Sequence, residues 1–322
     1  MTIDPRPVTR PLSVFALVVT VAAVLPTAQA PASPPPDAPA CEVLPQNNPW
    51  NQRVDDLPAV DRSDAIVRSI GTDAPLHPDF GSGRYKGGPI GIPYTTVGRR
   101  ADEVPVDFRY ADESDPGPYP IPRDVPIEGG ADAEGDRHAL VIDRYRCRLY
   151  ELFDAHPEDS GKRWQAGSGA TWRLDSNRLR PEGWTSADAA GLPIFPGLAR
   201  YDEVRNGEID HALRFTVPRS RRAFVYPARH FASDSSDPDL PKMGQRFRLD
   251  QGFDISGFPR QPRIVLRALK RYGMIVADNG SPWYVSGAPA EGWDNDDLHR
   301  LHEVQGADFE LVDTSSLPTP GD

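Results

Sequence analysis

The chain has 322 residues, with 36 lysines and arginines against 47 aspartates and glutamates, and a formal net charge of −11. This acidic balance speaks against nucleic acid as a partner, because phosphate binding requires a basic stripe. The length suits one large domain or two ordinary ones, and a hydrophobic fraction of 38% is enough for a core.

The first thirty residues have the pattern of a secretory signal peptide. Arg6 and Arg10 precede an apolar run from Leu12 to Leu25, and Ala28-Gln29-Ala30 forms an A-x-A cleavage site. An uncleaved anchor is the alternative, but the run is short for a membrane span of about 20 residues. We therefore expect residues 1–30 to be removed and the protein to be secreted, with no membrane contact after cleavage.

The segment after the signal peptide predicts a linker followed by one folded unit. Proline and alanine dominate residues 31–40, a composition typical of an extended spacer. Cys41 and Cys147 both lie in the exported part, where an even pair most simply forms a disulfide. Two separate buried thiols are the alternative. A single globular domain is expected over 41–313, with a disordered tail over 314–322.

Short strands and turns dominate the predicted domain, because 36 prolines and 27 glycines disfavour long helices. The strand candidates, taken from alternating or short apolar runs, are 90–97, 104–110, 138–153, 211–217, 221–228, 245–250, 274–278 and 282–287. Asn279-Gly280 predicts a hairpin between the last two. The triplet His-Ala-Leu opens both 138–153 and 211–217, so these strands are either neighbours in one sheet or share the triplet by chance.

Two helices are predicted near the C-terminus. An amphipathic pattern covers about 259–272, and Gly273 is a typical stop signal. A short helix is expected over about 294–304, with Asp294 as its N-cap. Many strands with few helices predict a mostly β fold, a single domain of the β-sandwich or jelly-roll type.

Candidate catalytic groups gather in the segment RYDEVRNGEIDHALRF, residues 200–215. Asn206-Gly207 predicts a turn there, and functional residues often lie on loops at the ends of strands. Two carboxylates can serve as general acid and as nucleophile or base at a glycosidic bond, and a histidine can replace one of them or shift its pKa. The alternative is that these are ordinary solvent-exposed residues without a catalytic role, since exposed turns are rich in acidic residues. The predicted catalytic residues are Glu203, Glu208, Asp202, His211 and His230.

A second group of residues lies in AFVYPARHFAS, residues 223–233. Tyr226 or His230 could act as a base while Arg229 neutralises a carboxylate, which is the chemistry of a polysaccharide lyase. The alternative is a capped strand end with a surface salt bridge.

Tryptophans near polar side chains predict a sugar-binding surface. Exposed indole rings stack on sugar rings, and nearby carboxylates and amides reach the hydroxyl groups. The alternative for each tryptophan is a place in the core. The predicted substrate-binding residues are Trp184, Asp188, Tyr226, Arg229, Asp278, Asn279, Trp283 and Trp293.

No metal or other cofactor is predicted. His138, His211 and His230 have no metal-ligand spacing such as H-E-x-x-H. The glycine-rich stretch GSGRYKGGPIG, residues 81–91, lacks the spacing of a phosphate-binding loop and is interpreted as an ordinary loop.

Several long segments of the chain resemble a secreted bacterial family common in actinomycetes, over nearly the whole mature chain. The resemblance implies a secreted setting, and it brings neither an activity nor catalytic residues to this sequence. The segments that carry it are NPWNQRVDDLP (48–58), ADESDPGPYPIP (111–122), GWTSADAAGLPIFPGLARYDEV (183–204), HALRFTVPRSRRAFVYPARHFAS (211–233) and LKRYGMIVADNGSPWYVSGAP (269–289).

These patterns together favour a secreted, monomeric, glycan-active enzyme, a glycoside hydrolase first and a polysaccharide lyase second. Its partner would be a polysaccharide or a cell-wall glycan. The alternatives are a carbohydrate- or cell-wall-binding protein without an acid/base pair, and a structural exported protein whose polar rims keep it in solution.

Overall fold

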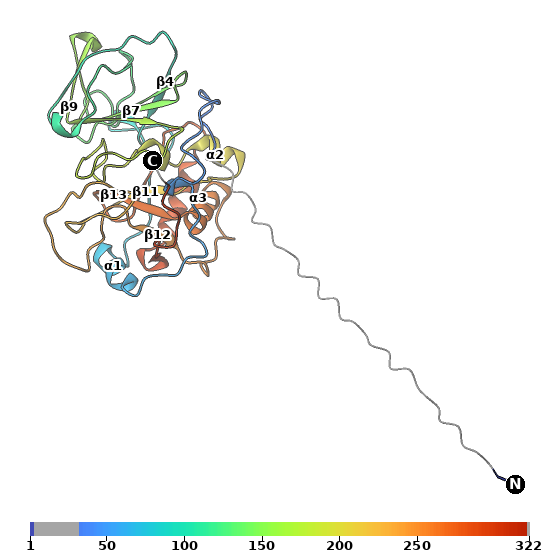
Figure 1. Ribbon diagram of the computed structural model, residues 1–322. Helices are drawn as coiled ribbons and strands as arrows, with labels where there is room; N and C mark the ends of the chain where they lie inside the picture. The colour runs from blue at the N-terminus through green and yellow to red at the C-terminus, as the bar shows by residue number, and fades with distance from the viewer. Residues whose placement is uncertain (3–31, 321–322) are drawn as a thin grey trace.

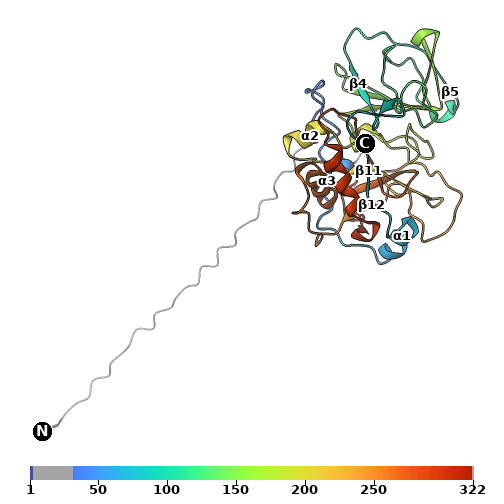
Figure 2. The ribbon, with the colours of Figure 1, turned by 180° about the vertical axis from the view of Figure 1, so that it is seen from behind.

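A computed structural model describes residues 1–2 and 32–320. The predicted signal peptide, residues 1–30, therefore lies outside the described residues apart from the first two. The fold is mostly β, as predicted, and it has two lobes that lie one above the other in Figures 1 and 2.

The small lobe contains residues 94–173 and carries a four-stranded sheet in the order β10-β7-β6-β4 and a three-stranded sheet in the order β5-β9-β8. The β4–β6 and β5–β9 pairs are parallel, whereas the other pairs are antiparallel. The strands are β4 Tyr94–Val97, β5 Val106–Phe108, β6 Ala139–Asp143, β7 Arg148–Phe153, β8 His156–Glu158, β9 Arg163–Ala166 and β10 Ser168–Arg173.

The large lobe carries a mixed six-stranded sheet in the order β1-β14-β11-β13-β12-β15. A short two-stranded hairpin of β2 and β3 follows β1 in the chain. The strands are β1 His77–Asp79, β2 Arg84–Tyr85, β3 Gly88–Pro89, β11 Leu213–Val217, β12 Arg246–Leu249, β13 Met274–Asn279, β14 Tyr284–Ser286 and β15 Phe309–Leu311. The helices are α1 Ser63–Ile70, α2 Tyr201–Asn206, α3 Arg260–Arg271 and α4 Asn295–His299.

Short 3-10 turns connect these elements. They are η1 Pro49–Asn51, η2 Ala111–Glu113, η3 Asp159–Gly161, η4 Phe195–Gly197, η5 Arg300–Glu303 and η6 Gly306–Asp308.

Both predicted helices are present. Ile264, Val265 and Leu269 on the apolar face of α3 are buried in the core of the large lobe, where the helix lies against β12. The side chain of Asp294 accepts hydrogen bonds from the backbone N–H groups of Asp296 and Asp297, so it caps α4 as predicted. The expected helix over 294–304 is divided into α4 and the 3-10 turn η5.

The structure contradicts the predicted hairpin and decides the open question of the two His-Ala-Leu strands. β13 and β14 flank Asn279-Gly280 but do not form a hairpin, because β11 lies between them, parallel to β13 and antiparallel to β14. The two His-Ala-Leu strands are not neighbours either. β6 pairs with β4 and β7 in the small lobe, whereas β11 is central in the large lobe.

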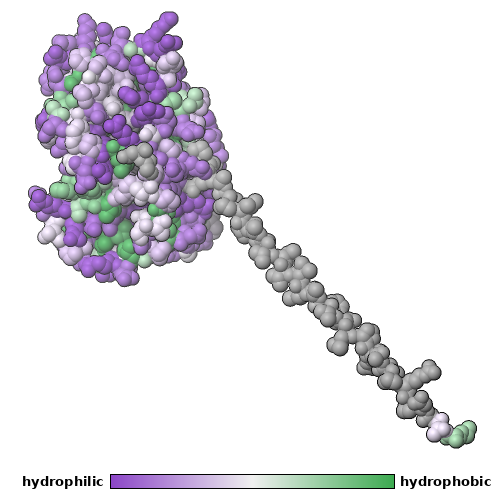
Figure 3. Space-filling view, in the orientation of Figure 1, coloured by the Kyte–Doolittle hydropathy of each residue, from purple (hydrophilic) through white to green (hydrophobic). Residues whose placement is uncertain are grey.

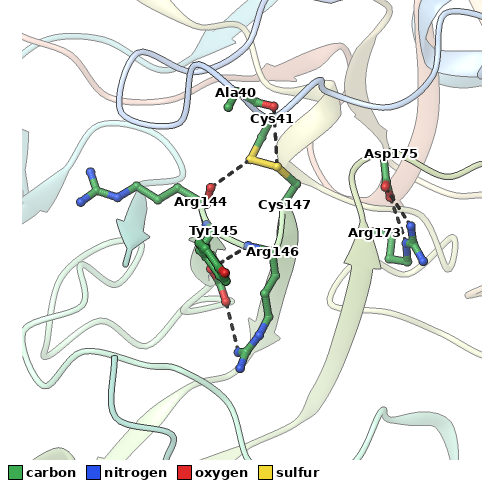
Figure 4. The surroundings of a disulfide bond; sticks show 9 residues. Ala40, Cys41, Arg144, Tyr145, Arg146, Cys147, Arg173 and Asp175 are labelled. Atoms are coloured by element: carbon green, nitrogen blue, oxygen red, sulfur yellow. Dashed lines mark hydrogen bonds and ion pairs between the residues drawn. A yellow bond between two sulfur atoms is a disulfide. The ribbon is translucent and has the colours of Figure 1, made fainter. Parts of the chain in front are cut away.

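The disulfide between Cys41 and Cys147 is present, with an S–S distance of 2.03 Å, and it attaches the N-terminal segment to the turn between β6 and β7 (Figure 4). The segment predicted as a free-standing linker packs on the domain instead. Ala32 and Ala38 are each only 1% exposed, because they join the apolar cluster that lies between the disulfide and the loop around Phe195.

The predicted disordered tail is described up to Pro320 and contacts the large lobe. The carbonyl of Pro318 accepts a hydrogen bond from the side chain of Gln52. Hydrophilic residues cover most of the face in Figure 3, with smaller hydrophobic patches on the lobe that carries α1.

Candidate functional site

The carboxylate placed first by the sequence, Glu203, is sealed inside the protein. It lies on α2 with no exposed surface, 2.7 Å from Nη2 of Arg200 and 3.1 Å from Nε2 of His211. Arg200 and His211 are equally enclosed, at 1% and 0% exposure. The turn expected at Asn206-Gly207 is the end of this short helix, with Gly207 in the left-handed conformation at φ 105°. A glycan cannot reach Glu203 in this arrangement.

The other predicted catalytic residues do not complete an accessible site around Glu203. Asp202 lies 3.5 Å from Nε of Arg200 and is largely enclosed. Glu208 points outward and forms a surface ion pair with Arg271. His230 belongs to a different neighbourhood, where Nδ1 faces the carbonyl of Ala189 at 2.8 Å. The structure brings Glu203 and His211 together and leaves Glu208 and His230 apart from them, which corrects the expectation of an open catalytic cluster.

Two of the three predicted sugar platforms belong to the core. Trp283 is 0% exposed, stacks between Phe215 and Phe309, and donates its indole N–H to the carbonyl of Gly71. Trp293 is 3% exposed and donates to Ala288. These rings stabilise the large lobe and offer no face to a ligand, so the platform prediction is wrong for both. Trp184 remains half-buried at the surface, where its ring lies 5.4 Å from the guanidinium of Arg180.

Asp188 has a structural partner instead of a free carboxylate. It is 1% exposed and accepts two hydrogen bonds from Arg214, at 2.9 and 2.8 Å. Arg214 also donates to the hydroxyl of Ser286 at 2.5 Å. Burial raises the pKa of Asp278 to about 7, and the nearby charge of Asp188 adds to this shift. Arg214 is thus a buried cation that balances Asp188 and opposes the rise in the pKa of Asp278.

The remaining predicted binding residues contact the protein itself. Asn279 donates its amide to the carbonyl of Ala232 at 2.7 Å. Arg229 donates to the carbonyl of Arg180 at 3.0 Å and lies 3.5 Å from Glu182. Tyr226 lines a separate cavity of about 360 Å³ against the C-terminal segment. These residues therefore hold loops in place rather than line one shared sugar site.

A larger cleft opens between the two lobes, with a volume of about 1100 Å³, and we call it the interlobe cleft. The large lobe contributes β1, Tyr284, α4 and η5, and the small lobe contributes the loop 128–137. The β2–β3 hairpin forms part of the wall and touches the turn after Glu128 so closely that a Cβ on Gly88 would lie 2.0 Å from the carbonyl oxygen of Gly129. Glycine at position 88 therefore allows the two segments to meet.

Three rings form an aromatic row along the interlobe cleft. Tyr284 stacks on His77 with ring centroids 4.0 Å apart, and His77 stacks on His302 at 5.0 Å. The two imidazoles also share a 2.9 Å contact between Nδ1 of His77 and Nε2 of His302. Burial lowers the pKa of His77 to about 4, and His302 and His299 add to the shift. The pKa of His302 is lowered as well, so neutral imidazoles are favoured in the row, which presents ring surfaces to the cleft.

Two carboxylates of the cleft have pKa values that are shifted in opposite directions. Partial enclosure raises the pKa of Asp79 above its usual range, and the charge of Glu128 raises it further. For Glu128, burial acts in the same upward direction, but the charge and hydrogen bond of His138 outweigh it and hold the pKa below its usual range. Asp79 is exposed to the cleft, and the side chain of Glu128 is 24% exposed.

His138 holds Glu128 in its ionised form. Its Nδ1 lies 2.6 Å from Oε2 of Glu128 and its Nε2 lies 3.0 Å from the carbonyl of Ala187, so both ring nitrogens face acceptors. Only the imidazolium can donate to both. Burial alone would lower the pKa of His138, but Glu128 raises it to about 9. The pair is an ion pair at neutral pH.

Sequence reasoning missed the interlobe cleft because its residues come from four distant segments. His77 and Asp79 lie in the string LHPDFG, directly before the glycine-rich stretch that was interpreted as an ordinary loop. Glu128 directly precedes Gly129-Gly130, and a Gly-Gly turn signal beside an acidic residue is the one local pattern that could have indicated a functional loop here. No local spacing connects these segments to Tyr284 or to α4.

No family model, curated protein or solved structure matches this chain. The resemblance to a secreted actinomycete family therefore stays a prediction. Among residues 1–2 and 32–320, no helix is long and apolar enough to cross a membrane. In the same part of the chain, no group of three or more histidine, cysteine or acidic side chains is arranged to hold a metal ion.

Proposed function

We propose that the protein is a secreted glycoside hydrolase whose reaction takes place in the interlobe cleft. The signal-peptide pattern and the disulfide support secretion, because disulfides persist in oxidising compartments. The observation that carries the proposed reaction is the pair of cleft carboxylates, Asp79 and Glu128, with pKa values shifted apart.

The proposed roles follow from the opposite directions of the two pKa shifts. Asp79, whose pKa is raised, is assigned the general acid that donates a proton to the oxygen of the leaving sugar. Glu128, kept ionised by His138, acts on the anomeric carbon directly or through a water molecule. The aromatic row of Tyr284, His77 and His302 supports a sugar ring by stacking. A cleft of about 1100 Å³ has room for more than one ring.

The charge of the cleft favours hydrolysis over the lyase alternative. Its lining carries five acidic side chains against two basic ones, Lys86 and Arg137; the acids are Asp79, Glu128, Asp132, Glu134 and Asp136. A lyase must bind a uronate, and these carboxylates would repel it. The proposed substrate at the scissile bond is therefore a neutral or amino-bearing sugar.

The test uses the purified protein with soluble neutral and amino-sugar polysaccharides, and new reducing ends are measured. Asp79→Asn and Glu128→Gln should each lower kcat by about 10²–10⁴-fold. Asp132→Asn is the matched control, because this exposed acid lines the same cleft and is assigned no proton transfer. Aryl glycosides with good leaving groups should largely rescue Asp79→Asn but not Glu128→Gln, since such groups need no acid.

Three outcomes would contradict the proposal. Unsaturated uronates, detected by ultraviolet absorbance, would indicate a lyase. Retention on a glycan affinity gel without turnover would indicate a binding protein. Equal activity of wild type, Asp79→Asn and Glu128→Gln would remove these two residues from the mechanism.

A further inference from the structure

Two arginines face each other across adjacent strands of the small lobe. Arg148 on β7 is the register partner of Arg173 on β10, and both are exposed. Like charges at directly opposite positions of an antiparallel pair repel each other and destabilise the sheet. Arg173 is balanced by Asp175, with hydrogen bonds of 2.9 and 2.8 Å (Figure 4). Arg148 makes no ion pair with any residue in the described part of the chain.

These arginines line a groove of about 320 Å³ that also contains two tryptophans. Arg180 is buried in its wall, where its guanidinium lies 2.6 Å from Asp115, 5.8 Å from the ring of Trp172 and 5.4 Å from that of Trp184. Arg178 is exposed at the edge and, within residues 32–320, its side chain has no carboxylate partner. The groove thus combines free guanidinium groups with a half-buried indole ring. We call it the arginine groove.

The charge of the arginine groove opposes that of the whole chain. Four arginines line it and Asp115 and Asp175 neutralise two of them, so two positive charges remain without a partner in a protein of net charge −11. A concave site with one sign of charge concentrates ligands of the opposite sign. The two arginines without partners, Arg148 and Arg178, lie where a ligand could supply the missing carboxylates or phosphates.

We propose that the arginine groove binds a saccharide that carries carboxylate or phosphate groups. Arg148 and Arg178 would hold the acidic groups, because a guanidinium matches carboxylate and phosphate geometry with two parallel hydrogen bonds. Trp184 would stack on the sugar ring that carries them. The groove is formed by β7, β10 and the segment 178–184, shares no lining residue with the interlobe cleft, and does not depend on the proposed hydrolysis.

The test measures binding to the full secreted chain by titration calorimetry and tryptophan fluorescence, with three probes. Trigalacturonate supplies rings and carboxylates, inorganic triphosphate supplies charge without rings, and maltotriose supplies rings without charge. Trigalacturonate should bind most tightly, with an affinity that falls as salt is added. A phosphorylated trisaccharide then distinguishes the two acidic groups by its affinity relative to trigalacturonate.

Variants locate the site. Arg148→Ala and Arg178→Ala should each weaken trigalacturonate about tenfold at low salt, and Trp184→Ala should weaken it while leaving triphosphate unchanged. Arg219→Ala, an exposed arginine outside the groove, is the matched control. Arg148→Lys keeps the charge but loses the paired hydrogen bonds, so it should restore only part of the affinity.

The results that would overturn the proposal are equally specific. Equal affinity for trigalacturonate and maltotriose would remove the role of charge. Equal affinity for triphosphate and trigalacturonate, together with no effect of Trp184→Ala, would show an anion site without saccharide recognition. An unchanged affinity in Arg148→Ala and Arg178→Ala would place the binding elsewhere.

Discussion

Two glutamate–histidine pairs lie within residues 32–320, and their surroundings differ. Glu203 and His211 lie 3.1 Å apart in the large lobe, and neither side chain has any exposed surface. Glu128 and His138 lie 2.6 Å apart between the lobes, where the histidine is 3% exposed and the glutamate 24%. The same two residue types thus form a sealed pair in one place and a pair that opens on a cleft in the other.

This difference separates a structural from a chemical role. Glu203 also binds Arg200 at 2.7 Å, so it has buried partners on two sides and no substrate can reach it. Glu128 has one cationic partner of its own and a second carboxylate nearby, Asp79, whose pKa it raises. A carboxylate with an open side can attack or accept a proton, whereas a sealed one can only stabilise its neighbours.

The largest expected effect is on stability at the sealed pair. Glu203→Gln leaves the buried Arg200 with only one carboxylate contact, the longer 3.5 Å contact to Asp202, and breaking a buried ion pair in this way costs about 3–5 kcal/mol. Glu128→Gln should cost less, about 2–3 kcal/mol at neutral pH, because its side chain is partly solvated and His138 can lose its proton. Urea denaturation at neutral pH measures both. Equal losses in the two variants would contradict the distinction between a sealed and an open pair.

The open pair should also leave a signature in the pH dependence of stability. Glu128 raises the pKa of His138 from 6.5 to about 9, so the stabilisation is complete below pH 6.5 and is lost as the pH rises through 9. His138→Gln should therefore be less stable than wild type by up to about 3 kcal/mol at pH 6, and the difference should vanish near pH 10.

At acid pH the stability of the protein changes with pH in the opposite direction. The pKa of Glu128 is lowered in the folded protein, so Glu128 stabilises the fold at pH values above the usual pKa of a glutamate, and this stabilisation is lost as the pH falls. His156→Gln serves as the control, since this histidine is 50% exposed beside Asp154 and should change the profile little. A constant difference between His138→Gln and wild type from pH 6 to 10 would rule out the ion pair.

The wall of the interlobe cleft offers a smaller test. Gly88→Ala would place a Cβ 2.0 Å from the carbonyl oxygen of Gly129, so the β2–β3 hairpin and the turn after Glu128 must separate. Overpacking of this kind costs about 1–3 kcal/mol, and we expect turnover to fall further than stability because Glu128 moves. Gly135→Ala, where a Cβ meets no atom within 4 Å, is the control. If turnover per folded molecule is the same in both variants, the hairpin does not position Glu128.

Local sequence signals predicted the features that depend on local interactions. The apolar stripe of α3, the Asp294 cap and the mostly β composition needed no knowledge of distant segments. The disulfide followed from the presence of only two cysteines. Asn206-Gly207 was predicted as a turn, but Asn206 is the last residue of the six-residue helix α2, which is too short to show periodicity, and Gly207 ends it.

The site could not be predicted in this way because it depends on tertiary arrangement. Trp283 and Glu203 resemble site residues in the sequence. Their burial becomes apparent only in the folded chain, where β11 lies between β13 and β14 and α2 packs on the core. Asp79 and Glu128 are separated by almost fifty positions, and only the contact between the lobes gives them a common cleft. Patterns of residue type therefore pointed to carboxylates and aromatic rings that the structure buries, and missed those that line the interlobe cleft.

The smallest expected effect is at Glu208, the second carboxylate that the sequence favoured. Its ion pair with Arg271 is on the surface, with side chains 46% and 39% exposed, so water and salt screen it and Glu208→Gln should change the free energy of unfolding by less than about 1 kcal/mol. Turnover should stay at the wild-type level, because Glu208 is absent from the lining of the interlobe cleft. The comparison with Glu128→Gln is direct, since both replace a glutamate with its amide. A loss of activity in Glu208→Gln with Glu128→Gln intact would return the catalytic assignment to the segment 200–215, and would require α2 to open in solution.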